Sequence, residues 1–173
     1  MTNSEAQDSQ KQEMIALVVL ANTYVDLTLD SVRAKLDEVF PGEFLPPRQK
    51  GNFVIDGPTP GGFLIQANLP GAAGIFLLHN VPAPYREFSD FAKAIADTAT
   101  RKKAMAQRCW LFVDRIGKHG SEEDSYSFIE QALAKLAPPD AAFLVHPSRL
   151  ITIPFDDDLR ARLARAERIL PNP

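Results

Sequence analysis

Two similar stretches, FLLHNVPAPYREFSDFAKAIADTA (Phe76–Ala99) and LITIPFDDDLRARLARAERIL (Leu150–Leu170), decide the expected fold. Each consists of an apolar run, a proline corner and then apolar residues at helical spacing. Four apolar residues of the first stretch recur in the second at one constant offset. The pairs are Phe88 and Leu159, Ala92 and Leu163, Ile95 and Ala166, and Ala99 and Leu170. Such a constant offset predicts an internal repeat.

The segments before these stretches also come in pairs. Met14–Asn22 is a short apolar run rich in β-branched residues, which predicts a buried strand, and Arg108–Ile116 predicts a second one. Thr28 and Ser121 are suitable N-caps for the helices expected after these strands. Each half therefore begins with a strand and a helix.

Glycine and proline turns separate the remaining strands, so these strands are expected to pair antiparallel. The first half has strand patterns at residues 52–56, 62–68 and 73–79, and the second at 141–146 and 149–154. A helix is expected from Pro84 toward Met105, and another helix is expected to close the chain.

The expected fold class is α+β, with two ferredoxin-like β-α-β-β-α halves and mainly antiparallel sheets. Residues 1–13 are polar and are expected to form a disordered tail. Residues 14–106 form the first half and residues 107–173 the second, packed as one globular unit. One such half leaves a sheet face bare, which the other is expected to cover or extend.

The composition narrows the classes of function. The chain has 173 residues and a net charge of −3, so it lacks a general attraction for nucleic acid or anionic lipid. The arginine-rich final helix lacks the interleaved aromatic residues of a nucleic-acid surface. Apolar runs are too short to span a bilayer, and no secretory signal is recognised. A single cysteine rules out an intrachain disulfide and fits the cytoplasm.

The order of elements also resembles that of a known family. WLFV (Trp110–Val113) opens the second half, and LITIP (Leu150–Pro154) precedes an amphipathic helix. In this respect Met14 to Leu170 is similar to a family of bacterial cytoplasmic proteins known as a domain of unknown function. The resemblance implies ferredoxin-like halves, a bacterial origin and a cytoplasmic location, and it assigns no catalytic residue.

One loop has the composition of an anion-binding site. It connects a predicted strand to a predicted helix, and backbone N–H groups at a helix N-terminus attract anions. Arg115, Lys118 and His119 would add positive or donor groups. The candidate ligand-binding residues are Arg115, Gly117, Lys118, His119, Gly120 and Ser121. The alternative is an ordinary polar connection between strand and helix.

The histidines do not form a metal-binding motif. His79 ends a strand, His119 lies in the loop above, and His146 lies at a hairpin turn. Hydrogen bonding within turns is the favoured interpretation. His79 and His146 could converge on a metal with a third ligand such as Asp56 or Asp140, but no metal site and no cofactor are predicted.

No catalytic residue is assigned. Cys109 adjoins Trp110 in a strand expected to be buried, where a cysteine acts as a small apolar residue rather than as a nucleophile. The leading hypothesis is a non-catalytic protein-interaction module of the bacterial cytoplasm, an adaptor or a neutralising, immunity-type factor whose partner is another protein. The alternative is a small-molecule or anion-binding enzyme that uses the 115–121 loop.

Overall fold

The computed structural model describes residues 14–45, 51–87 and 92–169. The described part contains seven strands and the four helices α1, α3, α4 and α5. The first half of the chain comprises β1 (Ala16–Ala21), α1 (Leu29–Val39), β2 (Phe53–Asp56), β3 (Gly62–Leu69), β4 (Ala72–Val81) and α3 (Thr98–Met105). The second half comprises β5 (Cys109–Arg115), α4 (Glu122–Leu136), β6 (Ala141–His146), β7 (Ile151–Pro154) and α5 (Asp157–Ala164). The α+β class is confirmed.

All seven strands belong to one antiparallel sheet with the order β2-β3-β4-β5-β1-β6-β7. The first strand of the chain therefore lies inside the sheet, between β5 and β6 of the second half. All six residues of β1 are buried, as its continuous apolar run predicts. The residue ranges of the two halves thus contribute to one continuous sheet.

The four central strands form two split β-α-β units, and the strand in the middle of each unit belongs to the other unit. Since neighbours are antiparallel, β1 and β4 run parallel with β5 between them, and β5 and β6 run parallel with β1 between them. Helix α1 lies on the connection from β1 toward β4, and α4 connects β5 to β6. This β4-β5-β1-β6 arrangement is a single ferredoxin-like topology formed by the whole chain. It does not show two ferredoxin-like halves, because neither half has this topology alone.

The helices observed near the end of each half also do not match the internal repeat that the constant offset predicts. Asp97 caps a short α3, accepting from the Thr100 N–H at 2.6 Å, so residues 84–105 do not form one helix. Ala99 is exposed rather than part of a buried stripe. Ala166 lies beyond α5 with a φ of 50°. Phe88 and Leu170 lie outside the described residues.

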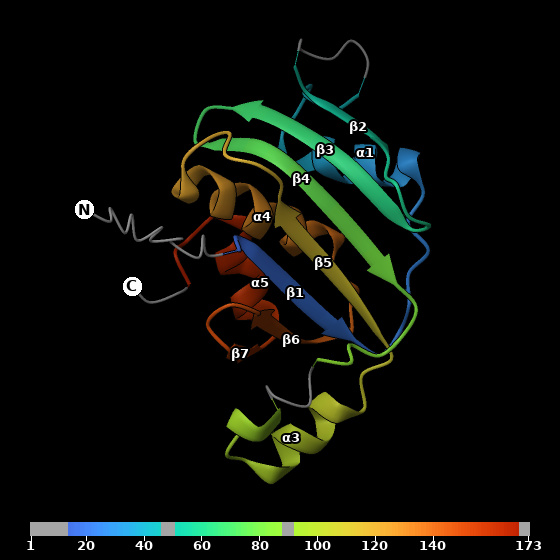
Figure 1. The fold of residues 1–173 in the computed structure, drawn as a ribbon, viewed down its shortest axis with the longest axis vertical. Coiled ribbons are helices and arrows are strands. Elements are labelled where there is room, and N and C mark those ends of the chain that lie inside the picture. Colours follow the sequence, from blue (N-terminus) through green and yellow to red (C-terminus); the bar gives the residue numbers. More distant parts are fainter. Residues whose placement is uncertain (1–13, 46–50, 88–91, 170–173) are drawn as a thin grey trace, which may run out of the picture.

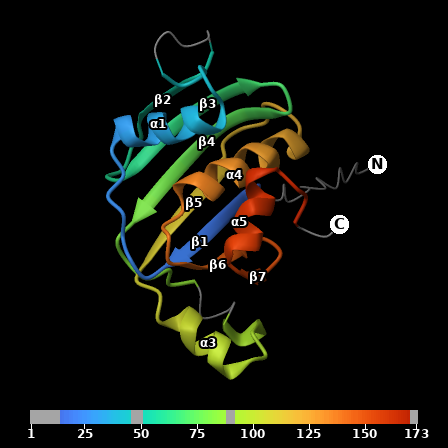
Figure 2. The ribbon, with the colours of Figure 1, turned by 180° about the vertical axis from the view of Figure 1, so that it is seen from behind.

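Helices α1, α4 and α5 cover one face of the sheet, behind the strands in Figure 1 and in front of them in Figure 2. The face that they cover forms the larger core, where Phe76 of β4 stacks on Phe128 of α4 with ring centroids 4.3 Å apart. Val32 and Leu36 of α1 and Ile129 and Leu133 of α4 are fully buried, as their helical spacing predicts. Burial of these side chains is the main stabilisation of the layered fold.

A much smaller set of residues packs against the opposite face of the sheet. Helix α3 lies beyond one end of the strands, below them in Figure 1. Ala92 and Ala104, before and within α3, pack with Val18 and Leu20 of β1 in a second, smaller core. The part of this face formed by β2, β3, β4 and β5 is not covered by α1, α4 or α5.

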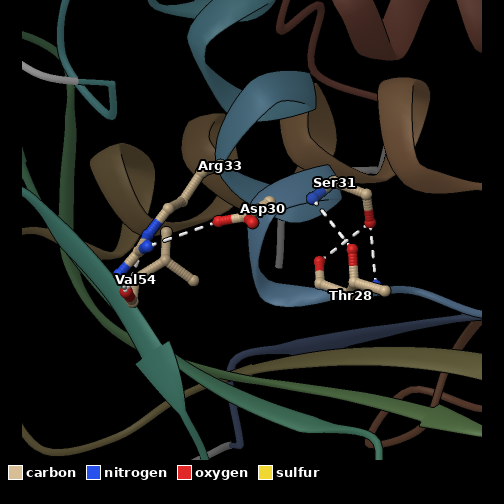
Figure 3. Close-up of polar contacts among 5 residues, drawn as sticks. All are labelled: Thr28, Asp30, Ser31, Arg33 and Val54. Atoms are coloured by element: carbon tan, nitrogen blue, oxygen red, sulfur yellow. Dashed lines mark hydrogen bonds and ion pairs between the residues drawn. The ribbon is translucent and has the colours of Figure 1, made fainter.

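Side chains of α1 fix its start and close the outer edge of β2 (Figure 3). Thr28 and Ser31 form a reciprocal capping box, with the Ser31 N–H donating to Thr28 Oγ1 at 3.2 Å and the Thr28 N–H donating to Ser31 Oγ at 2.9 Å. One turn later, Arg33 donates from Nε and Nη2 to the Val54 carbonyl oxygen at 3.2 and 2.8 Å. Arg33 thereby occupies an acceptor that an added strand would need.

In the described part of the chain, none of the helices has both the length and the apolar character needed to cross a membrane.

Candidate functional site

The part of the sheet that none of the described helices covers carries a group of side chains that we call the open face. Strand alternation and the cross-strand register place them on the side away from α1, α4 and α5. The open face consists of Phe53, Ile55, Leu64, Gln66, Ile75, Leu77, His79, Phe112 and Asp114. All of these are half-buried except Ile55, which is 44% exposed. Six of the nine are apolar, so the open face is an apolar patch that water reaches.

The register aligns three of the apolar residues with Asp114 in one row across four strands. Leu64 lies opposite both Ile55 and Leu77, and Leu77 lies opposite Asp114. Directly opposed side chains on one face lie within contact distance. The row therefore leads to a carboxyl group that stands on a mainly apolar surface.

Asp114 is the electrostatic centre of the open face. Its side chain is 22% exposed, and its Oδ1 atom is buried without a hydrogen-bond partner among the described residues. Burial raises the pKa of this carboxyl above its usual value, and the opposing effect of His79 is smaller. The ionised carboxylate is therefore poorly solvated in the isolated chain.

Aromatic rings border the open face toward α3. The Trp110 ring lies 5.3 Å from Tyr85 and 6.1 Å from Phe112, edge-on in both cases, and the Phe112 ring lies 5.7 Å from His79. Gln107 fixes the position of Tyr85 by accepting from its backbone N–H at 3.1 Å. This end of the open face is thus held in place by packed rings.

The loop predicted to bind anions is built around Arg115, which points back into it. Arg115 donates through Nη1 to Ser125 Oγ at 3.2 Å and to the Gly120 and Ser121 carbonyls at 3.5 Å. Gly120 has a φ of 81°, and a Cβ there would lie 2.7 Å from the Ala73 carbonyl oxygen. The guanidinium and the glycine therefore hold the loop against β4.

The other residues of the predicted site lie around the start of α4. Ser121 is the N-cap, as predicted, and its hydroxyl accepts from the Asp124 N–H at 3.0 Å. Lys118, His119 and Gly117 are exposed. The first turn of α4 carries three acidic residues, which complement the helix dipole and would oppose a bound anion. Anion binding by residues 115–121 stays a prediction.

The structure separates the other candidate residues. His79 lies on the open face, whereas His146 lies on the helix side and is hydrogen-bonded to Tyr126. The two histidines therefore do not converge. In the described ranges, no group of three or more histidine, cysteine, aspartate or glutamate residues is arranged to hold a metal ion.

Cys109 is a buried residue of β5. It is 3% exposed, its Sγ lies 3.4 Å from the Ala21 carbonyl oxygen, and burial raises the pKa of its thiol. A buried thiol with a raised pKa is a poor nucleophile at neutral pH.

Sequence reasoning missed the open face because β4 is apolar on both sides. Residues of β4 alternate between buried and half-buried, yet most side chains on both sides are apolar. Gln66, His79 and Asp114 are the polar residues among the nine side chains of the open face. Polar residues at these positions of otherwise apolar strands were the one signal of a site.

Comparison with known proteins leaves the site to be interpreted from its own chemistry. No family model matches the chain, and neither a curated protein nor a solved structure is significantly similar to it.

Proposed function

We propose that the protein is a non-catalytic interaction module that binds another protein on its open face. The observation that supports this most strongly is the apolar row Ile55–Leu64–Leu77 leading to the half-buried Asp114. Large apolar patches on a soluble protein are typical of binding surfaces. The role fits an adaptor or a neutralising factor of a bacterial cytoplasm.

The charge of Asp114 determines the chemistry of the partner. A partner that covered the open face with apolar groups alone would bury the carboxylate further, which is costly. A lysine or arginine among apolar side chains would instead pair with Asp114 and offset its desolvation. We therefore expect a partner with a cationic side chain at the centre of an apolar contact surface.

The charge of Asp114 also disfavours a second copy of this chain as the partner on the open face. A twofold axis near β4 and β5 would bring two Asp114 carboxyls together in an apolar interface. Like charges in such an environment repel each other or force protonation. The edge of β2 offers no simple alternative, because Arg33 already occupies the Val54 carbonyl.

Site-specific photo-cross-linking tests this proposal. A benzophenone amino acid is placed at Leu77 on the open face, and at Ala161 on the exposed side of α5 as the control. We expect a discrete product with a different protein from Leu77 and none of the same mass from Ala161. Products of a doubled chain mass, or no product from Leu77 in native cells, would overturn the proposal.

A further inference from the structure

A pocket of about 410 Å³ lies on the helix side of the molecule, away from the open face. Its walls come from α4, the β6–β7 hairpin, the segment that follows α5 and Gly71 of the β3–β4 turn. The charged residues in its lining are Glu122, Glu123, Asp124, Glu130, Arg149 and Arg168. The volume is within the range of small-molecule sites.

Glu130 is the unusual member of this lining. It belongs to the middle of α4, yet it is only 3% exposed. Burial raises its pKa to about 7, although Arg162 and Arg168 oppose the shift. A carboxyl buried this deeply in a pocket wall is a candidate ligand-binding group.

The charge balance of the pocket favours a cation. Arg149 lies 3.9 Å from Glu122, which neutralises one carboxylate at the rim. Arg162 and Arg168 both favour ionised Glu130, and the Ile169 N–H donates to its carboxyl group. Glu123 and Asp124 have no ion pair within the part of the chain that the structure describes. The four carboxyl groups of the lining therefore outnumber the three guanidinium groups near them, those of Arg149, Arg162 and Arg168.

Hydrogen bonds hold the two main walls together. The Tyr126 hydroxyl of α4 is 2.7 Å from His146 Nε2, and the Arg149 N–H donates to His146 Nδ1 at 3.2 Å. Because Nδ1 accepts, a neutral His146 carries its proton on Nε2 and donates it to Tyr126. The pocket wall formed by α4 and the hairpin is thus held by side chains and backbone of the chain itself.

We infer that this pocket binds a small organic cation, an amine or a guanidinium compound, with its charged end at Glu130 and Asp124. Tyr126 supplies an aromatic surface in the same lining, and aromatic rings attract cations. The site is separate from the open face, so the inference does not depend on the proposed protein partner.

The test is titration of the purified chain with agmatine and putrescine at pH 8, followed by calorimetry and amide NMR. We expect binding in the micromolar to millimolar range, with shifts in α4 around Tyr126 and Glu130. Glu130→Gln should weaken binding at least tenfold, and Asp124→Asn should weaken it severalfold. Glu38→Gln is the matched control, since it removes an exposed carboxylate of α1 and should leave binding unchanged.

The pH dependence separates a ligand contact from a structural effect. The groups that face Glu130 are Arg162 from α5, Arg168 from the segment after it and the neighbouring acids of α4. With a pKa of about 7, ionised Glu130 becomes scarce at pH 6, so binding to the native chain should be about tenfold weaker than at pH 8. Glu130→Gln should abolish this dependence.

Three results would overturn the inference. The first is no heat and no amide shift at roughly 10 mM of either amine. The second is equal affinity of the Glu130→Gln chain, with its fold verified by circular dichroism. The third is preferential binding of succinate, which would show that the arginines rather than the carboxyls attract the ligand.

Discussion

His79 Nε2 and Asp114 Oδ1 lie 4.0 Å apart on neighbouring strands in the middle of the open face. This distance is too long for a hydrogen bond, so the imidazole only partly compensates the carboxyl. The open face therefore combines an apolar surface with an incompletely neutralised charge. We expect this combination to give the proposed partner both affinity and selectivity.

Removing the charge of Asp114 should stabilise the isolated chain at neutral pH. The folded-state pKa is raised, so the protonated form is favoured and its stabilisation is lost as the pH rises through that value. Asp114→Asn cannot ionise, and we expect a higher free energy of unfolding than the native chain at pH 7, with a smaller gain at pH 4. Denaturant unfolding measures both, and Asp56→Asn, at an exposed position of β2, is the control. A less stable Asp114→Asn chain at pH 7 would show that the carboxylate is well compensated.

Glu130→Gln should change the pH dependence of stability. The folded-state pKa of about 7 lies above the usual 4.5, so the stabilisation by protonated Glu130 is present below pH 4.5 and lost as the pH rises through 7. We expect the variant to exceed the native chain by on the order of 2–3 kcal/mol at pH 8 and to match it near pH 4. Urea unfolding across this range is the measurement. If the free energies of unfolding of the native chain and of Glu130→Gln changed with pH in the same way, Glu130 would not be buried as described.

Arg33→Ala should loosen the outer edge of β2. The variant loses both hydrogen bonds to the Val54 carbonyl, which we expect to cost about 1–2 kcal/mol and to speed amide exchange in β2. The matched variant Asp30→Ala removes a carboxylate that lies 3.6 Å from Arg33 and is almost fully exposed, so it should cost less than about 0.5 kcal/mol. Equal effects of the two variants would contradict this account.

Alanine substitutions of Arg115 and Lys118 should distinguish a structural role of their loop from a ligand-binding role. Arg115→Ala removes contacts with Ser121 and Ser125 and should destabilise the chain by about 1 kcal/mol, whereas Lys118→Ala should be nearly neutral. Amide NMR with inorganic phosphate tests the anion-binding prediction. Shifts at Gly117, Gly120 and Ser121 that Lys118→Ala abolishes would support it, and their absence would leave the loop as a connector.

Local elements could be predicted from the sequence because local chemistry determines them. Thr28 and Ser121 accept backbone hydrogen bonds at helix starts, and the apolar run of β1 is buried on both sides. The break before α3 was missed because Asp97, its N-cap, lies inside an apparently continuous apolar period. One capping side chain there outweighs the helical pattern.

The strand order and both proposed sites depend on long-range contacts. Strand β1 pairs with β5 and β6, which follow it by most of the chain, and no local pattern encodes that choice. Likewise, Glu130 lies in an ordinary helical sequence and becomes buried only through tertiary packing. The constant offset and the apolar periodicity describe the pattern within elements and not the contacts between them. They could therefore not identify which face of the sheet stays open.

Charge reversal at Asp114 combined with photo-cross-linking from Leu77 tests the central claim most directly. The yield of the heteromeric product is compared among the native chain, Asp114→Lys and Glu123→Lys, the last being a matched reversal at an exposed residue of α4. We predict that Asp114→Lys reduces the yield at least tenfold, because two cations would meet in an apolar contact, while Glu123→Lys preserves it. Undiminished cross-linking with Asp114→Lys would contradict a partner that places its cation at this carboxyl.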